Sequence, residues 1–306
     1  MSLENSPTVR AFDAGQLPAL LKAPGEKSHK YTRGVLGVLT GSEDYPGAAL
    51  MSVRAAVNTG VGMVRFVGTS QLNFLINLSV PEAVCSTGDP LELRVDAWAL
   101  GSGVGQGSRL EHIRAVLSTE TAAVGDAGAV PLAAQLVAGG RILMQQHILT
   151  PHAGELADFF TWLLALAPNL FDGAAPERAE IEADPVFWAS QAAYLSGATV
   201  LLKGGVTHVA TSDGKLVLTV ESNSPWLATA GSGDTLTGIM GALLAQHQAH
   251  HTQPSAPLIY AQLAAAAVTV HGLASDLVHT PGTRGPLPPT EVAQRLPAAL
   301  AQLLSV

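Results

Sequence analysis

The segment Ala230–Gly238, AGSGDTLTG, contains the residue types that phosphate chemistry requires. Free N–H groups at the start of a helix attract anions, and glycines let a phosphate approach the main chain closely. Asp234 in the same turn could take the proton from a hydroxyl group that attacks a phosphorus atom. The alternative is that Asp234 only caps or charges the N-terminus of a helix. The segment therefore predicts either a phosphoryl-transfer site or an ordinary helix start.

The segment LLKGGVTHVAT places a lysine at the end of a predicted strand. Gly204 and Gly205 follow Lys203 directly, so backbone amides would lie next to its ammonium group. A lysine beside exposed amides suits a nucleotide phosphate. A hairpin-like connection with a solvated lysine is the alternative. Thr207 then begins the next predicted strand.

The segment ILTPHAGE places His152 and Glu155 just after another predicted strand. His152 could bind a substrate, and Glu155 could hold magnesium through water, because hard cations prefer carboxylate oxygen. In the alternative interpretation Pro151 starts a helix and Glu155 lies in its first turn. The glycine-rich loop Gly101–Gly107 also follows a strand. It lacks the dinucleotide fingerprint, so it either opens a substrate pocket or permits close backbone packing.

Strands and helices alternate along the chain, which predicts a mostly parallel sheet covered by helices on both faces. The Asp-Gly pair in Ser212–Lys215 predicts an antiparallel hairpin. Ligands bind beyond the carboxyl ends of the strands in such sheets, where the polar loops described above lie. The predicted strands are Gly34–Gly41, Met63–Val67, Ala83–Cys85, Ala97–Leu100, Ala122–Gly125, Ile148–Thr150, Thr199–Leu202, Thr207–Ala210 and Leu216–Val220, and the predicted helices are Pro46–Asn58, Asp234–His247, Pro257–Ala274 and Glu291–Leu304.

Composition excludes several classes of protein. The 306 residues are 47% hydrophobic and 13% charged, which excludes a disordered chain, and the net charge of −8 argues against a nucleic-acid surface. Cys85 is the single cysteine, so no internal disulfide can form and a reducing, cytoplasmic setting is expected. The N-terminus does not have the pattern of a signal peptide. The uncharged stretch Thr235–Ser275 has a polar middle, which predicts two buried helices rather than a membrane span.

The chain is expected to form one domain. Residues 1–30 precede the first predicted strand and are interpreted as an N-terminal extension to a single domain over residues 31–306. The polar segment Pro168–Pro185 is interpreted as a surface insertion. His247, His250 and His251 could bind a metal, but without a further ligand motif they are interpreted as a helix end and loop.

In this order, the motifs resemble the NAD(P)H-hydrate dehydratase family of the ribokinase-like superfamily. The match runs from about His29 to His271 and includes YPGAALMSVRAAVNTGVGMVR, DAWALGSGVG, TPHAGE, LLKGGVTHVAT and AGSGDTLTGIMGALLA. Where the family usually has Gly-Thr-Gly-Asp and Gly-Pro-Gly-Leu-Gly, this chain has Gly231–Asp234 and Gly101–Gly105 with the glycines kept. The usual Asp-Ala-Asp is Asp126-Ala127-Gly128 here, so the second acid is lost.

This resemblance implies a fold, an activity and a set of site residues. The fold would be a ribokinase-like three-layer α/β/α sandwich. The activity would be ADP-dependent dehydration of the S-epimer of hydrated NADH or NADPH, yielding AMP and phosphate, with Mg²⁺ and with ADP or ATP as co-substrate. Asp234 matches the catalytic base. The substrate-binding positions are Ala48, Gly105, His152 and Asp234, the nucleotide-binding positions are Lys203, Gly204, Gly205, Val206, Thr207, Gly231 and Gly233, and Glu155 would hold the metal through water.

The resemblance also implies partners. Many relatives are fused to an epimerase domain, for which the residues before the first predicted strand leave no room, so a separate NAD(P)H-hydrate epimerase is expected. A homo-oligomer such as a tetramer is expected as well. Two rivals remain: a ribokinase-like kinase acting on a thiazole or pyridoxal alcohol, which would use the same anion hole and base, and a nucleotide-binding protein without catalysis.

Overall fold

One mixed sheet of ten strands organises the part of the chain that the computed structural model describes, residues 6–21, 23–105, 107–170, 173–221, 224–251 and 253–304. The strand order across the sheet is β1-β10-β9-β8-β7-β6-β5-β2-β3-β4. The strands are β1 Thr8–Ala11, β2 Val35–Leu39, β3 Met63–Val67, β4 Val84–Ser86, β5 Ala97–Leu100, β6 Ala122–Gly125, β7 His147–Leu149, β8 Thr199–Leu202, β9 Val206–Ala210 and β10 Leu216–Glu221.

Strands β2 to β8 pair in parallel, and β9 is antiparallel to both of its neighbours. The predicted hairpin joins β9 and β10. Its turn is held by Asp213, whose carboxylate accepts hydrogen bonds from the Thr211 hydroxyl at 2.7 Å and the Lys215 amide at 3.2 Å. Gly214 has φ +68°, a conformation that favours glycine. All nine predicted strands are present within one or two residues.

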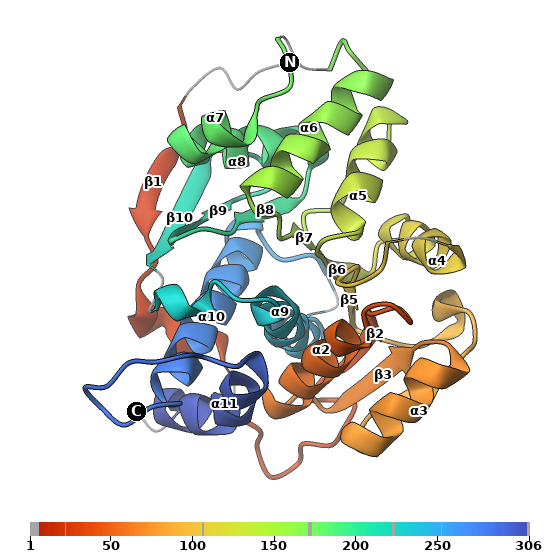
Figure 1. Ribbon diagram of the computed structural model, residues 1–306, viewed down its shortest axis with the longest axis vertical. Helices are drawn as coiled ribbons and strands as arrows, with labels where there is room; N and C mark the ends of the chain where they lie inside the picture. The colour runs from red at the N-terminus through yellow and green to blue at the C-terminus, as the bar shows by residue number, and fades with distance from the viewer. Residues whose placement is uncertain are drawn as a thin grey trace.

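Helices cover both faces of the sheet, which confirms the predicted three-layer α/β/α sandwich (Figure 1). One face is covered by α2, α9, α10 and α11, whose apolar side chains form the largest buried cluster, and α4 to α8 cover the other face. The helices are α1 Leu17–Leu20, α2 Pro46–Asn58, α3 Ser70–Ser79, α4 Ser108–Leu117, α5 Ala129–Ala138, α6 Ala153–Leu166, α7 Arg178–Ala183, α8 Pro185–Ser196, α9 Ser232–Gln248, α10 Pro257–Asp276 and α11 Pro289–Leu304.

The uncharged stretch Thr235–Ser275 forms α9 and α10, as the two-helix prediction requires. By length and composition alone α10 could cross a membrane, but 67% of its most apolar window is buried inside the protein. The two helices belong to the same apolar cluster as α2. Helix α9 approaches α2 very closely at Gly238, where an added Cβ would lie 2.2 Å from the carbonyl oxygen of Ser52. Helix α10 is therefore a core helix of this fold.

Two segments differ from the sequence expectations. Strand β1 lies within residues 1–30 and pairs in parallel with β10; its four residues are all exposed, so no hydrophobic pattern signals it. The segment Pro168–Pro185 is not simply a surface insertion, because it contains α7 and Ile181 has no exposed surface and joins the core. Phe171 and Asp172 of that segment, and residues 1–5 and Lys22 of the extension, lie outside the described residues.

Candidate active site

The start of α9 is a glycine turn with an acid in the first helical turn. Gly231 is the N-cap residue and has φ +92°, a backbone conformation that favours glycine. An added Cβ there would also lie 2.3 Å from the Sδ atom of Met51, so the space favours glycine as well. The helix begins at Ser232, two residues before the predicted start, and Asp234 occupies its third position. Asp234 is therefore not the N-cap residue. The turn presents free amides to an anion with a carboxylate next to them.

Lys203 lies next to this turn and is held by two carboxylates. Its Nζ atom is 2.7 Å from Oδ1 of Asp126 and 3.5 Å from Oε2 of Glu155. An added Cβ on Gly233 would lie 3.7 Å from the same Nζ atom. The ammonium group therefore lies beside the helix start, as a phosphate-binding lysine would.

Asp126 is the centre of a buried hydrogen-bond network. Its carboxylate, with 5% of the side chain exposed, accepts hydrogen bonds from the Ser102 hydroxyl at 2.8 Å and the Thr150 hydroxyl at 2.9 Å, besides the lysine. Ser102, Asp126, Thr150 and Lys203 follow β5, β6, β7 and β8, which are neighbours in the sheet. The carboxyl ends of four adjacent parallel strands thus supply one network, at the edge where ligands bind in such sheets.

These contacts shift the pKa values of the site. Burial alone would raise the pKa of Asp126, but the lysine and the two hydroxyl groups more than offset it, so that its pKa lies below the ordinary value. Burial opposes the charge of Lys203 too, yet Asp126 and Glu155 raise its pKa, and both groups remain ionised. Burial and the negative charge of Asp126 raise the pKa of Asp234 to about 6, against a smaller opposing effect of Lys203. A carboxylate with that pKa suits a general base at neutral pH.

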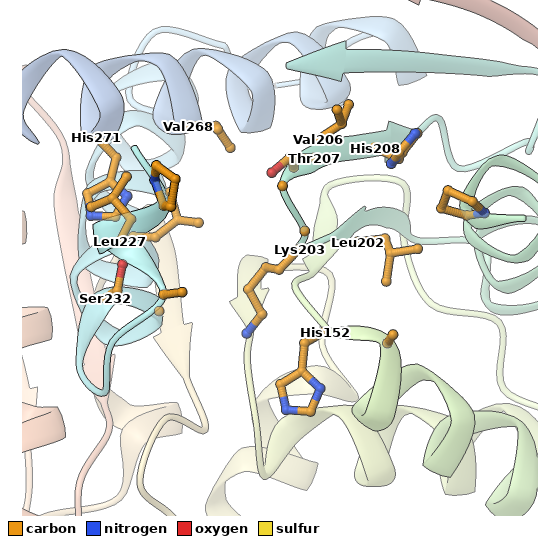
Figure 2. A pocket seen from close by; sticks show the side chains of 18 of the residues that line it. His152, Leu202, Lys203, Val206, Thr207, His208, Leu227, Ser232, Val268 and His271 are labelled. Carbon is orange, nitrogen blue, oxygen red and sulfur yellow. The ribbon is translucent and has the colours of Figure 1, made fainter. Parts of the chain in front are cut away.

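A cavity of about 890 Å³ opens beside Lys203 (Figure 2). Its walls come from the start of α6, the turn between β8 and β9, helix α7, the loop before α9, the start of α9 and the C-terminal half of α10. Of the predicted site residues, those that line it are His152, Lys203, Gly204, Gly205, Val206, Thr207 and Gly233. The cavity thus joins the predicted nucleotide segment to the glycine turn.

His152 and Glu155 form a reciprocal cap at the start of α6. The Glu155 amide donates to Nδ1 of His152 at 3.1 Å, and the His152 amide donates to Oε2 of Glu155 at 2.8 Å. Glu155 therefore lies in a first helical turn, although the helix begins at Ala153 and not at Pro151. The contact of Glu155 with Lys203 also puts it at the site. No group of three or more His, Cys, Asp or Glu side chains able to hold a metal occurs among the described residues.

The histidines at the end of α9 form a local structure. The rings of His247 and His251 stack at 4.1 Å, Nε2 of His247 is 2.8 Å from the Ser255 hydroxyl oxygen, and Nδ1 of His251 is 2.8 Å from the His247 carbonyl oxygen. His250 follows the end of the helix, which supports the helix-end interpretation.

Ala48 and Gly105 are not part of the cavity wall. Ala48 lies in the first turn of α2 and is 6% exposed, while Gly105 is exposed with open space around its Cα atom. Gly103, in the same loop as Gly105, has φ +67°, and an added Cβ there would lie 2.7 Å from the Cβ atom of Ala48. The glycine loop therefore packs closely on α2, and Ser102 connects it to Asp126. Gln106 of this loop lies outside the described residues.

Two features of the site had not been assigned from sequence. In the sequence Asp126 stood out only because Gly128 replaces the second acid of the usual Asp-Ala-Asp. In the structure Asp126 is the ion-pair partner of Lys203. His271, which ended the family resemblance, is a buried residue of the cavity wall. A histidine within the uncharged, largely apolar stretch Thr235–Ser275 was the signal in the sequence that could have pointed to it.

Comparison with known proteins supplies a family. The model of the NAD(P)H-hydrate dehydratase family matches residues 36–298. The bifunctional NAD(P)H-hydrate repair enzyme Nnr of Mycobacterium tuberculosis is 39% identical over 241 residues, 78% of this chain and 46% of that protein. The ADP-dependent (S)-NAD(P)H-hydrate dehydratase of Neisseria meningitidis is 34% identical over 276 residues, 86% and 83% of the two chains. The chain thus spans about half the length of the bifunctional relatives that it matches.

Solved structures agree with this result. The ADP/ATP-dependent NAD(P)H-hydrate dehydratase of Bacillus subtilis, co-crystallised with ATP and Mg²⁺, has a TM-score of 0.73 at 25% identity, with 98% of this chain and 100% of that chain covered. A hydroxyethylthiazole kinase of Pyrococcus horikoshii has a TM-score of 0.58 at 15% identity, with 94% and 95% covered. The kinase resemblance concerns the fold alone.

Proposed function

The chain belongs to the NAD(P)H-hydrate dehydratase family, and from this we propose that it converts the S-epimer of hydrated NADH or NADPH back to NADH or NADPH with ADP as co-substrate. One observation carries the proposal: a carboxylate with a raised pKa lies in the glycine turn of α9, beside a lysine at the edge of a cavity of about 890 Å³. The bacterial relative with the ADP-dependent name supports the choice of nucleotide.

In the proposed reaction the hydroxyl group of the hydrated ring is first phosphorylated. Asp234 takes the hydroxyl proton, the oxygen attacks the β-phosphorus of ADP, and AMP leaves. The new phosphate ester then departs as phosphate together with a proton from the neighbouring ring carbon, which restores the double bond. The amides around Gly231 and Gly233 would hold the transferred phosphate, and Lys203 would balance its charge.

The remaining site residues receive roles in the same proposal. Gly204, Gly205, Val206 and Thr207 would contact the nucleotide, since all four line the cavity next to Lys203. The hydrated cofactor would lie against Ala48, Gly105 and His152, and of these three His152 also lines the nucleotide cavity. Nε2 of His152 would contact it, because Nδ1 already accepts a hydrogen bond from the Glu155 amide, and Nε2 lies 3.7 Å from Oε2 of Glu155.

Magnesium fits this site as a companion of the nucleotide. Mg²⁺ usually binds one or two carboxylates together with substrate phosphates and water. Glu155 is the acid placed to assist, since its side chain is 20% exposed and lies beside Lys203. It would hold the ion through water, and the ion would neutralise phosphate charge. The Bacillus subtilis dehydratase that was co-crystallised with ATP and Mg²⁺ supports the use of magnesium with the nucleotide.

Recovery of NADH absorbance from hydrated NADH and ADP tests the proposal directly. A mixture of both epimers should be consumed to about half and then stall, because one stereochemistry fits a single hydroxyl position. Adding an NAD(P)H-hydrate epimerase, the proposed partner, should drive the reaction to completion, with one AMP and one phosphate per NADH. Accumulation of a stable phosphorylated alcohol, with no NADH formed, would support the kinase alternative instead.

Location and assembly remain proposals of the same kind. The single cysteine, Cys85, fits a reducing cytoplasm, where NADH and NADPH are used. A homo-oligomer such as a tetramer is proposed from the family resemblance, and light scattering of the purified chain would measure it.

We expect Gly205→Ala to weaken ADP binding without affecting folding. An added Cβ at Gly205 meets no protein atom within 4 Å, so the fold can accommodate it, but Gly205 lines the cavity where the main chain would approach the nucleotide. Calorimetric titration should show an ADP dissociation constant raised by about tenfold. Gly25→Ala is the matched control, because its Cβ also meets nothing within 4 Å and Gly25 lies outside the cavity wall. Equal ADP affinity in both variants would contradict the assignment.

The pH dependence of turnover should follow the pKa of Asp234. The base works only when deprotonated, and burial with the Asp126 charge raises its pKa to about 6. The kcat/KM value should therefore be constant at mildly alkaline pH and fall about tenfold per pH unit below about 6, because kcat/KM reports the pKa values of the free enzyme. ADP affinity, measured over the same range, separates loss of the base from loss of nucleotide. A kcat/KM value that stays constant down to the ordinary pKa of aspartate would contradict the role.

A further inference from the structure

His271 presents a buried polar atom to the cavity with nothing in the described chain to pair with it. The residue lies on α10, is 5% exposed and belongs to the cavity wall. Its Nε2 atom is buried and has no hydrogen-bond partner among the described residues. Buried polar atoms are nearly always paired in native proteins, because an unpaired one is unfavourable. A bound ligand could supply the missing hydrogen-bond partner of Nε2.

The surroundings of His271 fit a flat, largely apolar group. Leu227, Leu236 and Val268 line the cavity from the loop before α9, from α9 itself and from α10. Figure 2 shows His271 and Leu227 at one end of the cavity and Lys203 at its centre. Apolar walls with a few convergent polar groups are typical of small-molecule sites. Ser232, at the start of α9, lies at the same end, so a group beside His271 would adjoin the phosphates proposed to lie between the turn of α9 and Lys203.

The charge state of His271 separates two classes of ligand group. Burial lowers the pKa of His271 to about 4, so the ring is neutral at physiological pH. A neutral imidazole donates one hydrogen bond and accepts another, which matches the edge of an uncharged base. A phosphate would instead favour a cationic ring.

We propose that His271 recognises the base of the nucleotide by a hydrogen bond from the base edge to its Nε2 position, with the base packed against Leu227, Leu236 and Val268. The inference rests on the proposed use of ADP. It assigns the recognition of the base to α10, while the turn of α9 and Lys203 contact the phosphates.

His208 is the natural comparison at the other end of the cavity. It lines the same cavity, its Nδ1 atom is buried without a partner among the described residues, and Figure 2 places it on the far side of Lys203 from His271. Its ring is partly exposed, whereas that of His271 is almost fully enclosed. A base bound at the far end would depend on His208 instead.

The test is calorimetric titration of the full chain with ADP and with inorganic pyrophosphate, a probe without a base. His271→Leu should raise the ADP dissociation constant by about tenfold or more while changing that of pyrophosphate by less than about twofold. His271→Gln, which keeps a hydrogen-bonding group, should retain more ADP affinity than His271→Leu. His208→Leu should leave ADP affinity within about twofold of the wild type.

The outcomes separate this inference from the proposed function. Unchanged ADP affinity in His271→Leu, equal losses for both probes, or the ADP loss in His208→Leu alone would each overturn the role of His271. Wild-type protein that binds pyrophosphate but no ADP would overturn the proposed function as well. Thermal melting checks the fold: His271→Leu should melt no lower than the wild type, because the buried unpaired atom is gone.

Discussion

Asp234→Asn is expected to reduce turnover by about 10²–10⁴-fold while the protein folds normally and binds ADP, since an amide cannot take the substrate proton. The anion site should survive because it consists of main-chain amides, and Gly231 and Gly233 are kept. Stability should be unchanged or slightly higher above pH 6. In the native protein burial and Asp126 raise the pKa of Asp234 to about 6, so its ionised form opposes folding at neutral pH.

Turnover number, ADP affinity and melting temperature should be measured together on this variant. Glu111→Gln is the matched control, because it also removes an acid from the first turn of a helix, α4, and its side chain is 70% exposed away from the cavity. The control should keep wild-type turnover. If Asp234→Asn retained more than about a tenth of wild-type turnover, Asp234 would not be the base.

Lys203→Met should have the largest effect on stability. The substitution leaves the Asp126 carboxylate buried without its cation, and breaking a buried ion pair of this kind costs about 3–5 kcal/mol of unfolding free energy. Denaturant unfolding measures the loss. ADP affinity should fall as well, because the cation beside the phosphate site is gone.

The pH dependence of unfolding separates this explanation from a simple packing defect. The pKa of Asp126 is lowered in the native protein, so its ion pair stabilises the wild type above the ordinary pKa of aspartate and is lost as the pH falls below it. In Lys203→Met, burial and Asp234 would raise that pKa, and the variant should gain stability as Asp126 becomes protonated. A loss that did not depend on pH would indicate packing alone.

A double variant divides the two roles of the lysine. Lys203→Met with Asp126→Asn removes both charges, so most of the unfolding free energy should return. ADP affinity should stay low, because no cation faces the phosphates. Recovery of wild-type ADP affinity in the double variant would show that Lys203 acts on structure and not on nucleotide binding.

The sheet could be predicted from sequence because its strands carry strong local signals. The segments Met63–Val67, Ala97–Leu100 and Thr199–Leu202 are short, mostly apolar runs, and each is a strand with those bounds in the structure. Strand β1 has no such pattern, since its residues are exposed and its pairing with β10 depends on a segment about 200 residues away. Local periodicity cannot report a pairing of that kind.

The site was only partly predictable for a related reason. Asp234 and Lys203 could be identified because each is next to glycines in the sequence, a pattern that indicates a phosphate site. The partners of Asp126 are 24 residues away for Ser102 and 77 residues away for Lys203. Only the strand order brings them to one edge of the sheet. The roles of Ala48, Gly105 and the magnesium contact of Glu155 stay predictions.

The close contact between α2 and α9 at Gly238 determines how freely the site can rearrange. An added Cβ would lie 2.2 Å from a backbone oxygen of α2, so the two helices leave no room to slide past each other. Helix α9 carries Asp234 and α2 carries Ala48, so the spacing between the proposed base and the proposed site of the hydrated ring would be set before either ligand arrives. Such preorganisation spares the reaction the free energy of reorienting its base. Any closure over the ligands would then fall to other parts of the cavity wall, such as α7.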